Sequence, residues 1–134
     1  MRALPLILVL VLAGCAQQET STNDFKGAEK EVAAAVEDLQ TNAQNRKPSE
    51  ICTNNLSREL ADRLKTGGSD CTSEMEKITR DADDFQLDVT DVAITGNTAT
   101  ASVKTRKGDD KDATVTFTLV KEGGDWRLSD LGAS

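Results

Sequence analysis

The chain contains no histidine and no tyrosine, and aromatic residues make up only 3% of its 134 residues. Histidine is the side chain used most often for acid–base catalysis near neutral pH, and tyrosine is another common proton donor. Serine and threonine are plentiful, but no histidine is present to activate one of them as a nucleophile. The sequence therefore contains no recognisable catalytic constellation, and we expect a non-catalytic protein without a cofactor.

Basic residues are also few. The chain has 16 lysine and arginine residues against 23 aspartate and glutamate residues, which gives a formal net charge of −7. Binding to nucleic acid needs a basic surface that neutralises phosphates. The charge balance therefore argues against a nucleic-acid partner.

The one long apolar run lies at the N-terminus. Residues 1–14 have one positive residue, then a short apolar stretch, then small residues, which is the pattern of an export signal. The sequence Leu12-Ala13-Gly14-Cys15 resembles the bacterial lipobox, and this resemblance implies that Cys15 is lipidated and becomes the mature N-terminus. We expect attachment to a membrane, on the extracytoplasmic side of a bacterial envelope, through this lipid. The alternative is an ordinary signal peptide with an incidental cysteine.

The remaining chain divides into a short tether and one domain. Residues 15–24 are polar after the cysteine, so we expect a flexible tether. Residues 25–134 have the length of a single domain. Apolar residues at helical spacing predict a first helix from Phe25 to Ala43, a second from Pro48 to Leu64, and a third from Ser73 to Ala82 with a capping box at its start.

Four runs of alternating apolar and polar residues follow, which is the period of a half-buried strand. The first run changes phase, and a β-bulge near Thr90-Asp91 would restore it. Short turns rich in glycine and asparagine join the runs, so neighbouring strands are expected to be antiparallel. The sequence predicts an α+β fold, with two or three N-terminal helices packed on a curved four-stranded antiparallel meander. Its runs are Phe85–Ile94, Ala99–Val103, Ala113–Leu119 and Trp126–Leu128.

Two cysteines remain once Cys15 is set aside. An even pair in an exported protein predicts a disulfide between Cys52 and Cys71. A redox or metal pair is the alternative, although the two residues are not spaced as Cys-x-x-Cys and histidine is absent. Two aspartate groups offer oxygen ligands for calcium but lack the spacing of a calcium loop, so we expect charged turns and no metal. These groups are Asp81, Asp83 and Asp84, and Asp109, Asp110 and Asp112.

Two segments carry a resemblance to a known family. The Val-x-Ile-x-Gly-Asn-x-Ala pattern within Val89–Ala101 and the strand, glycine turn and Trp-Arg-Leu ending of Phe117–Leu128 resemble small lipoproteins of the nuclear-transport-factor-2-like superfamily, the cystatin-like α+β roll. The resemblance implies a sheet curled around a long helix, often with a conical pocket. Candidate pocket residues are Trp126, Asp91 and Phe117.

The expected function is binding of a protein partner or a small apolar ligand at the cell envelope. One alternative is a minimal lyase or isomerase that uses an aspartate in the pocket, for which Asp91 is the candidate. Another is a purely structural interaction module with a filled core and no ligand. Superfamily membership does not choose among these functions, and the sequence does not specify an oligomeric state.

Overall fold

The structure is a computed structural model that describes residues 24–65, 68–108 and 111–132. The predicted signal peptide, Cys15 and nearly all of the tether lie outside these ranges. Within them, no helix is both long enough and apolar enough to cross a membrane.

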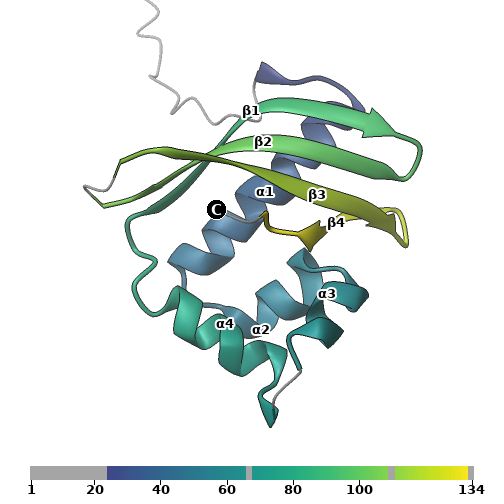
Figure 1. Ribbon diagram of the computed structural model, residues 1–134. Coiled ribbons are helices and arrows are strands. Elements are labelled where there is room, and N and C mark those ends of the chain that lie inside the picture. Colours follow the sequence, from purple (N-terminus) through teal and green to yellow (C-terminus); the bar gives the residue numbers. More distant parts are fainter. Residues whose placement is uncertain (1–23, 66–67, 109–110, 133–134) are drawn as a thin grey trace, which may run out of the picture.

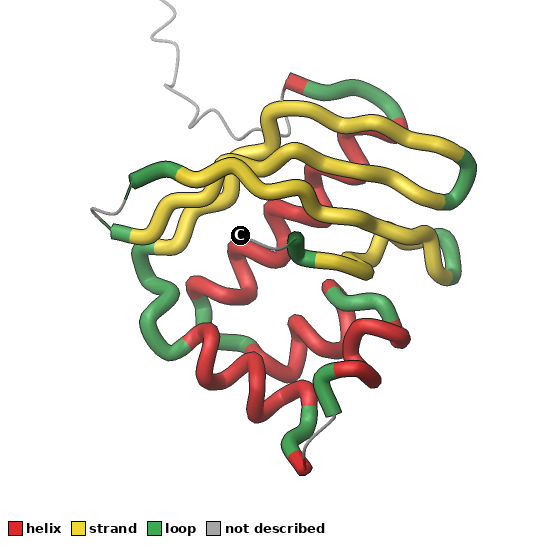
Figure 2. The backbone as a smooth tube through the Cα atoms, viewed as in Figure 1, coloured by secondary structure: helices red, strands yellow, loops and turns green. Residues whose placement is uncertain are grey.

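A four-stranded antiparallel meander forms one layer of the domain, and helices cover one of its faces (Figures 1 and 2). This arrangement confirms the predicted α+β class. The first two strands are paired so that Val89 faces Val103 and Asp91 faces Ser102, which leaves Thr90 as the extra residue of the predicted bulge. The strands, in spatial as well as chain order, are β1 (Phe85–Thr95), β2 (Thr98–Lys107), β3 (Ala113–Glu122) and β4 (Asp125–Asp130).

The first helix, α1 (Ala28–Gln44), runs along the inner face of the sheet and contacts β1, β2 and β4. Its apolar residues at spacings of three and four turn toward the strands, as an amphipathic helix requires. Val32, Ala33 and Val36 are completely buried there. The helix begins three residues later than Phe25, because Gly27 before it has a positive φ of 62° that is not helical.

Two glutamines of α1 cover the start of the outer edge of the sheet. Gln44 donates a hydrogen bond to the carbonyl of Phe85 (2.6 Å), and the side-chain oxygen of Gln40 accepts one from the amide of Leu87 (2.5 Å). Backbone groups on an edge strand have no strand partner on one side. These two side chains supply partners to β1, and nothing in the sequence pattern predicted them.

The prediction of one continuous second helix from Pro48 to Leu64 is wrong. The chain forms α2 (Pro48–Glu50), then a π-helical turn, η2 (Ile51–Asn55), and then leaves helical geometry at Leu56. Leu56 is 2% exposed and forms a parallel bridge with Leu128, and the amide of Ser57 donates to the carbonyl of Leu128 (2.8 Å). The chain therefore leaves the helix at Leu56, because the extended backbone there lets Leu56 pack against the sheet and pair with β4.

A separate short helix, α3 (Arg58–Arg63), begins after this break. The hydroxyl of Ser57 caps it by accepting a hydrogen bond from the amide of Leu60 (3.1 Å). A serine cap satisfies one of the amides that a helix start leaves without a partner. Leu56 and Leu60 keep a spacing of four residues across the break, which is why the periodicity suggested one helix.

The last helix, α4 (Cys71–Thr79), starts and ends earlier than the predicted Ser73–Ala82. Its cap is Asp70, whose carboxylate accepts a hydrogen bond from the amide of Ser73 (2.7 Å), so the predicted capping box at Ser73 is wrong. This hydrogen bond lowers the pKa of Asp70. Cys71 forms a disulfide with Cys52 of η2, as the sequence predicted.

Candidate functional site

An apolar cavity of about 310 Å³ lies between the helices and the inner face of the sheet. Its wall is built from α1, η2, α4, three strands and the C-terminal segment after β4. None of the lining residues is ionisable. They are Leu39, Ala43, Ile51, Leu56, Met75, Ile78, Thr79, Phe85, Thr105, Val115, Phe117, Leu131 and Gly132.

The helical wall is tied together by the disulfide. Ile51 lies in η2 next to Cys52, whereas Met75 lies one turn after Cys71 in α4. Because the Cys52–Cys71 bond joins these two elements, it fixes the distance between the two parts of the wall. Ile78, further along α4, is 60% exposed and forms part of the lining, so it marks the mouth of the cavity.

The C-terminal segment contributes through a close approach to β3. Gly132 has a positive φ of 74°, and a side-chain carbon at this position would lie only 2.8 Å from the carbonyl oxygen of Thr116. Only glycine is compatible with both the backbone geometry and this distance. Leu131, just before it, is thereby placed against the cavity.

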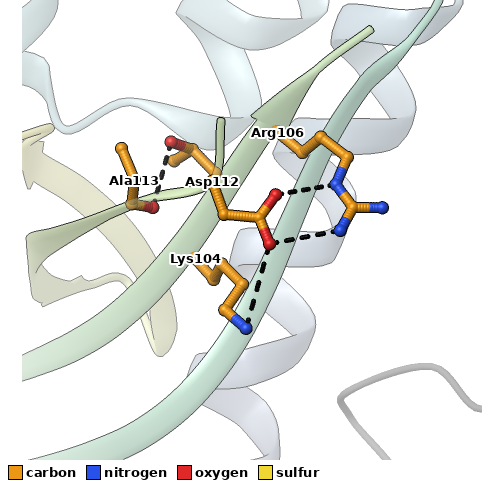
Figure 3. Close-up of polar contacts among 5 residues, drawn as sticks. Lys104, Arg106, Asp112 and Ala113 are labelled. Atoms are coloured by element: carbon orange, nitrogen blue, oxygen red, sulfur yellow. Dashed lines mark hydrogen bonds and ion pairs between the residues drawn. The ribbon is translucent and has the colours of Figure 1, made fainter. Parts of the chain in front are cut away.

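An ion cluster holds the end of the β2–β3 hairpin that supplies Thr105 and Val115 to the wall (Figure 3). Asp112 binds Arg106 through two contacts of 2.7 and 3.1 Å, and Lys104 lies 4.0 Å from the same carboxylate. The hydrogen bonds from Arg106 lower the pKa of Asp112. Thr105 adds a hydrogen bond to the carbonyl of Ala113 (3.3 Å), so polar contacts fix this end of the hairpin.

The lining determines what the cavity can hold. A charged or strongly polar group would lose its hydration there without gaining a partner, which is costly. Apolar cavities of about 150 Å³ lined by similar side chains stay dry and bind small apolar molecules. This cavity is larger and suits an apolar molecule, while its wall offers no acid–base pair.

The structure separates the three candidate pocket residues. Phe117 lines the cavity. Trp126 is buried on the same sheet but lines a different, polar groove beside α1. Asp91 lies exposed at the β-bulge and lines neither site, so nothing in its surroundings favours a catalytic role.

Other functional residues escaped the sequence reasoning. The helical spacing within Ser73–Ala82 predicts that Met75 and Ile78 lie on the apolar side of the third helix, which is correct for Met75, whereas Ile78 is largely exposed. Thr105 carried no signal, because its predicted strand ended at Val103. Of the two aspartate groups, Asp83 forms an ion pair with Arg46 (2.7 Å), Asp112 belongs to the hairpin cluster, and Asp109 and Asp110 fall outside the described residues. Among the described residues, no group of three or more potential ligands is placed to hold a metal ion.

The fold and the cavity define a class of protein: a small α+β domain in which helices and a curved meander enclose an apolar space. Within this class, residues 56–133 match the family model described as low molecular weight antigen MTB12, C-terminal domain. The match spans more than half of the chain, and the chain belongs to this family. It includes α3, α4 and the whole sheet, but not α1 or η2. A comparison with curated proteins gave no match.

Proposed function

We propose that this protein is a lipid-anchored envelope protein that holds a small apolar ligand in the cavity between α4 and the sheet. The observation that carries the proposal is the cavity itself, about 310 Å³ in volume and lined without an ionisable side chain. This volume lies at the lower end of the range for ligand sites in proteins. Each methylene group buried there would contribute about 0.8 kcal/mol to binding.

The envelope location is supported by separate features. The lipobox-like sequence ending at Cys15 would attach the chain to a membrane, and the polar residues up to Asp24 would hold the domain close to the bilayer. The Cys52–Cys71 bond suits an oxidising compartment. The family takes its name from an antigen, and a protein exported to the envelope is consistent with that name.

The architecture also supports membership of the nuclear-transport-factor-2-like superfamily. The curved meander packs around the long helix α1, and the cavity occupies the inner side of the sheet. The lining has no acid–base group, which favours a binding role over the lyase or isomerase chemistry found elsewhere in that superfamily.

Native mass spectrometry of the protein purified from an exporting host tests the ligand proposal. We expect a non-covalent adduct whose mass identifies an apolar compound. Ala43→Leu places a larger side chain in the cavity and should abolish the adduct, because Ala43 is 4% exposed and lines the space. Ala93→Leu, at an exposed position of β1, is the matched control and should keep it. An adduct that survives Ala43→Leu unchanged would contradict the proposal.

A protein partner is the second candidate, and Ile78 favours it. Among the described residues, Ile78 is the large hydrophobic side chain that remains exposed. A partner that buries it would cover the cavity mouth at the same time. Ile78→Ser should then weaken partner capture, whereas Ala43→Leu should leave partner capture unchanged and abolish binding of a small apolar ligand.

A further inference from the structure

A polar groove of about 640 Å³ lies on the other side of α1 and shares no lining residue with the apolar cavity. One wall is the outer face of α1, with Glu31, Ala34 and Asp38. The opposite wall is the start of β4, with Trp126 and Arg127. The end of η2 closes the groove between them.

Two nitrogen donors at this groove have no partner among the described residues. The indole nitrogen of Trp126 and the Nε atom of Arg127 are both buried and make no hydrogen bond. Trp126 as a whole is 7% exposed, and Lys121 lies over its ring, with the ammonium 5.6 Å from the ring centroid. A buried donor without an acceptor is destabilising, so an acceptor from outside the chain, either a water molecule or a ligand, would stabilise each of these donors.

The acidic side of the groove is prearranged by a network of amides. Asn55, which is 2% exposed, donates to the carboxylate of Asp38 (2.8 Å) and accepts from Asn42 (2.8 Å). The π-helical turn η2 presents Asn54 and Asn55 at this point, and such turns often occur at functional sites. Asn42 also donates to the carboxylate of Asp38, and the hydrogen bonds from Asn42 and Asn55 both end at Oδ2. The other carboxylate oxygen, Oδ1, is left to accept a hydrogen bond from a ligand.

The charged side chains that line the groove indicate which kind of ligand it can bind. Glu31, Asp38 and Asp125 outweigh Arg127 in the lining, so an anion would be repelled. A simple cation would satisfy the carboxylates but would leave the two buried donors without acceptors. A neutral molecule with several hydroxyl groups satisfies both requirements, because each hydroxyl can accept from a nitrogen and donate to a carboxylate.

We propose that this groove binds a segment of a neutral saccharide chain. The sugar hydroxyls accept hydrogen bonds from Trp126 and Arg127 and donate to Asp38 and Glu31. This site is separate from the apolar cavity, and it would place a lipid-anchored domain against an uncharged glycan of the envelope.

Trp126 provides the measurement, because it is the single tryptophan of the chain and gives one indole N–H signal in a nitrogen-15 NMR spectrum. The exported protein is titrated with the neutral trisaccharides triacetylchitotriose, maltotriose and cellotriose, and separately with spermidine and trilysine. We expect a saturable downfield shift of the indole signal with at least one trisaccharide. The absence of a shift with every trisaccharide overturns the proposal, and a shift caused by trilysine instead identifies a basic peptide as the occupant.

Variants separate the groove from the cavity. Ala34→Phe, at an exposed position of α1 in the groove wall, should block the trisaccharide, whereas Ala93→Phe on exposed β1 and the cavity variant Ala43→Leu should not. Trp126→Phe removes the donor and should weaken binding measured by calorimetry about tenfold, and it should also lower the melting temperature, because Trp126 is buried and the smaller ring leaves a hole. Full binding by Ala34→Phe would overturn the proposal even where Trp126→Phe fails to fold.

Discussion

The two parts of this domain share one apolar core but differ in how their backbones are held. The sheet and α1 form a continuous unit, in which the strands are joined by long ladders of backbone hydrogen bonds. The segment from α2 to α4 consists of short helices that bury Ile51, Leu56, Cys71 and Met75 in the shared core and are held further by capping side chains, a bridge to β4 and a disulfide. The apolar cavity lies where the two parts meet, so its shape depends on how firmly the second part is attached to the first.

The largest expected effect is on the sheet. Leu119 is completely buried in β3 and does not line the cavity. Leu119→Ala should lower the free energy of unfolding by about 4 kcal/mol, because it removes buried surface and leaves a hole that the packed strands cannot close. Urea unfolding followed by circular dichroism measures this change.

In the segment from α2 to α4, the half-buried Leu60 of α3 is the position to compare with Leu119. Leu60→Ala should lower the free energy of unfolding by only about 1 kcal/mol, since less surface is lost. Equal losses of unfolding free energy in Leu119→Ala and Leu60→Ala would contradict the view that the sheet is held more firmly than the segment from α2 to α4.

Loss of the disulfide should have the next largest effect on the free energy of unfolding. Replacing Cys52 and Cys71 together by serine should cost about 3 kcal/mol, because the bond closes a loop with a sequence separation of 19 residues. The loss should be local, so hydrogen exchange should accelerate in α4 more than in β2 and β3. Uniform acceleration across the domain would show instead that the helical segment and the sheet unfold as one unit.

The cap of α3 should have a smaller effect. Ser57 is 1% exposed, and its hydroxyl accepts the hydrogen bond from the amide of Leu60. Ser57→Ala should lower the free energy of unfolding by about 1 kcal/mol, as helix caps usually do. Ser49→Ala, at an exposed position of α2, should leave the melting temperature nearly unchanged and serves as its control.

The smallest effect should appear on acidification. The hydrogen bonds from Ser73 lower the pKa of Asp70 below its ordinary value of 3.8. A lowered pKa in the folded state means that this contribution to stability is complete above the unfolded-state pKa and is lost as the pH falls through the folded-state pKa. The stability of α4 should therefore decrease below about pH 3.8.

The variant Asp70→Asn keeps a capping oxygen but does not titrate at this position. Its loss of stability on acidification should be smaller than that of the parent protein, when both are followed by circular dichroism. Identical acid profiles would show that the cap of α4 does not contribute to the pH dependence.

The difference between the sheet and the segment from α2 to α4 also explains which features could be predicted from the sequence. The strands, their turns and the bulge at Thr90 followed from a period of two residues and from glycine-rich connections, both of which are local signals. The break at Leu56 could not be predicted, because its cause is a bridge to Leu128 far along the chain. Only the folded sheet makes extended geometry at Leu56 more favourable than another helical turn.

The candidate site was predictable in part for the same reason. Phe117 lies in the cavity because the alternation of β3 turns it inward. Trp126 also turns inward, but it lies beside the outer face of α1 and lines the groove, a placement that depends on where the helix crosses the sheet. The cavity itself arises from several elements at once and has no signature in any single segment.

One measurement tests the central claim, that the cavity binds a small apolar ligand. The chain has two methionines, Met1 in the predicted signal peptide and Met75 in the cavity wall. In the processed protein labelled with carbon-13 in the methionine methyl group, a titration with decanol should therefore shift one signal, that of Met75, in a saturable way, and Ala43→Leu should abolish the shift. A Met75 signal that stays in place throughout the titration, in a folded protein free of any bound adduct, would contradict the claim.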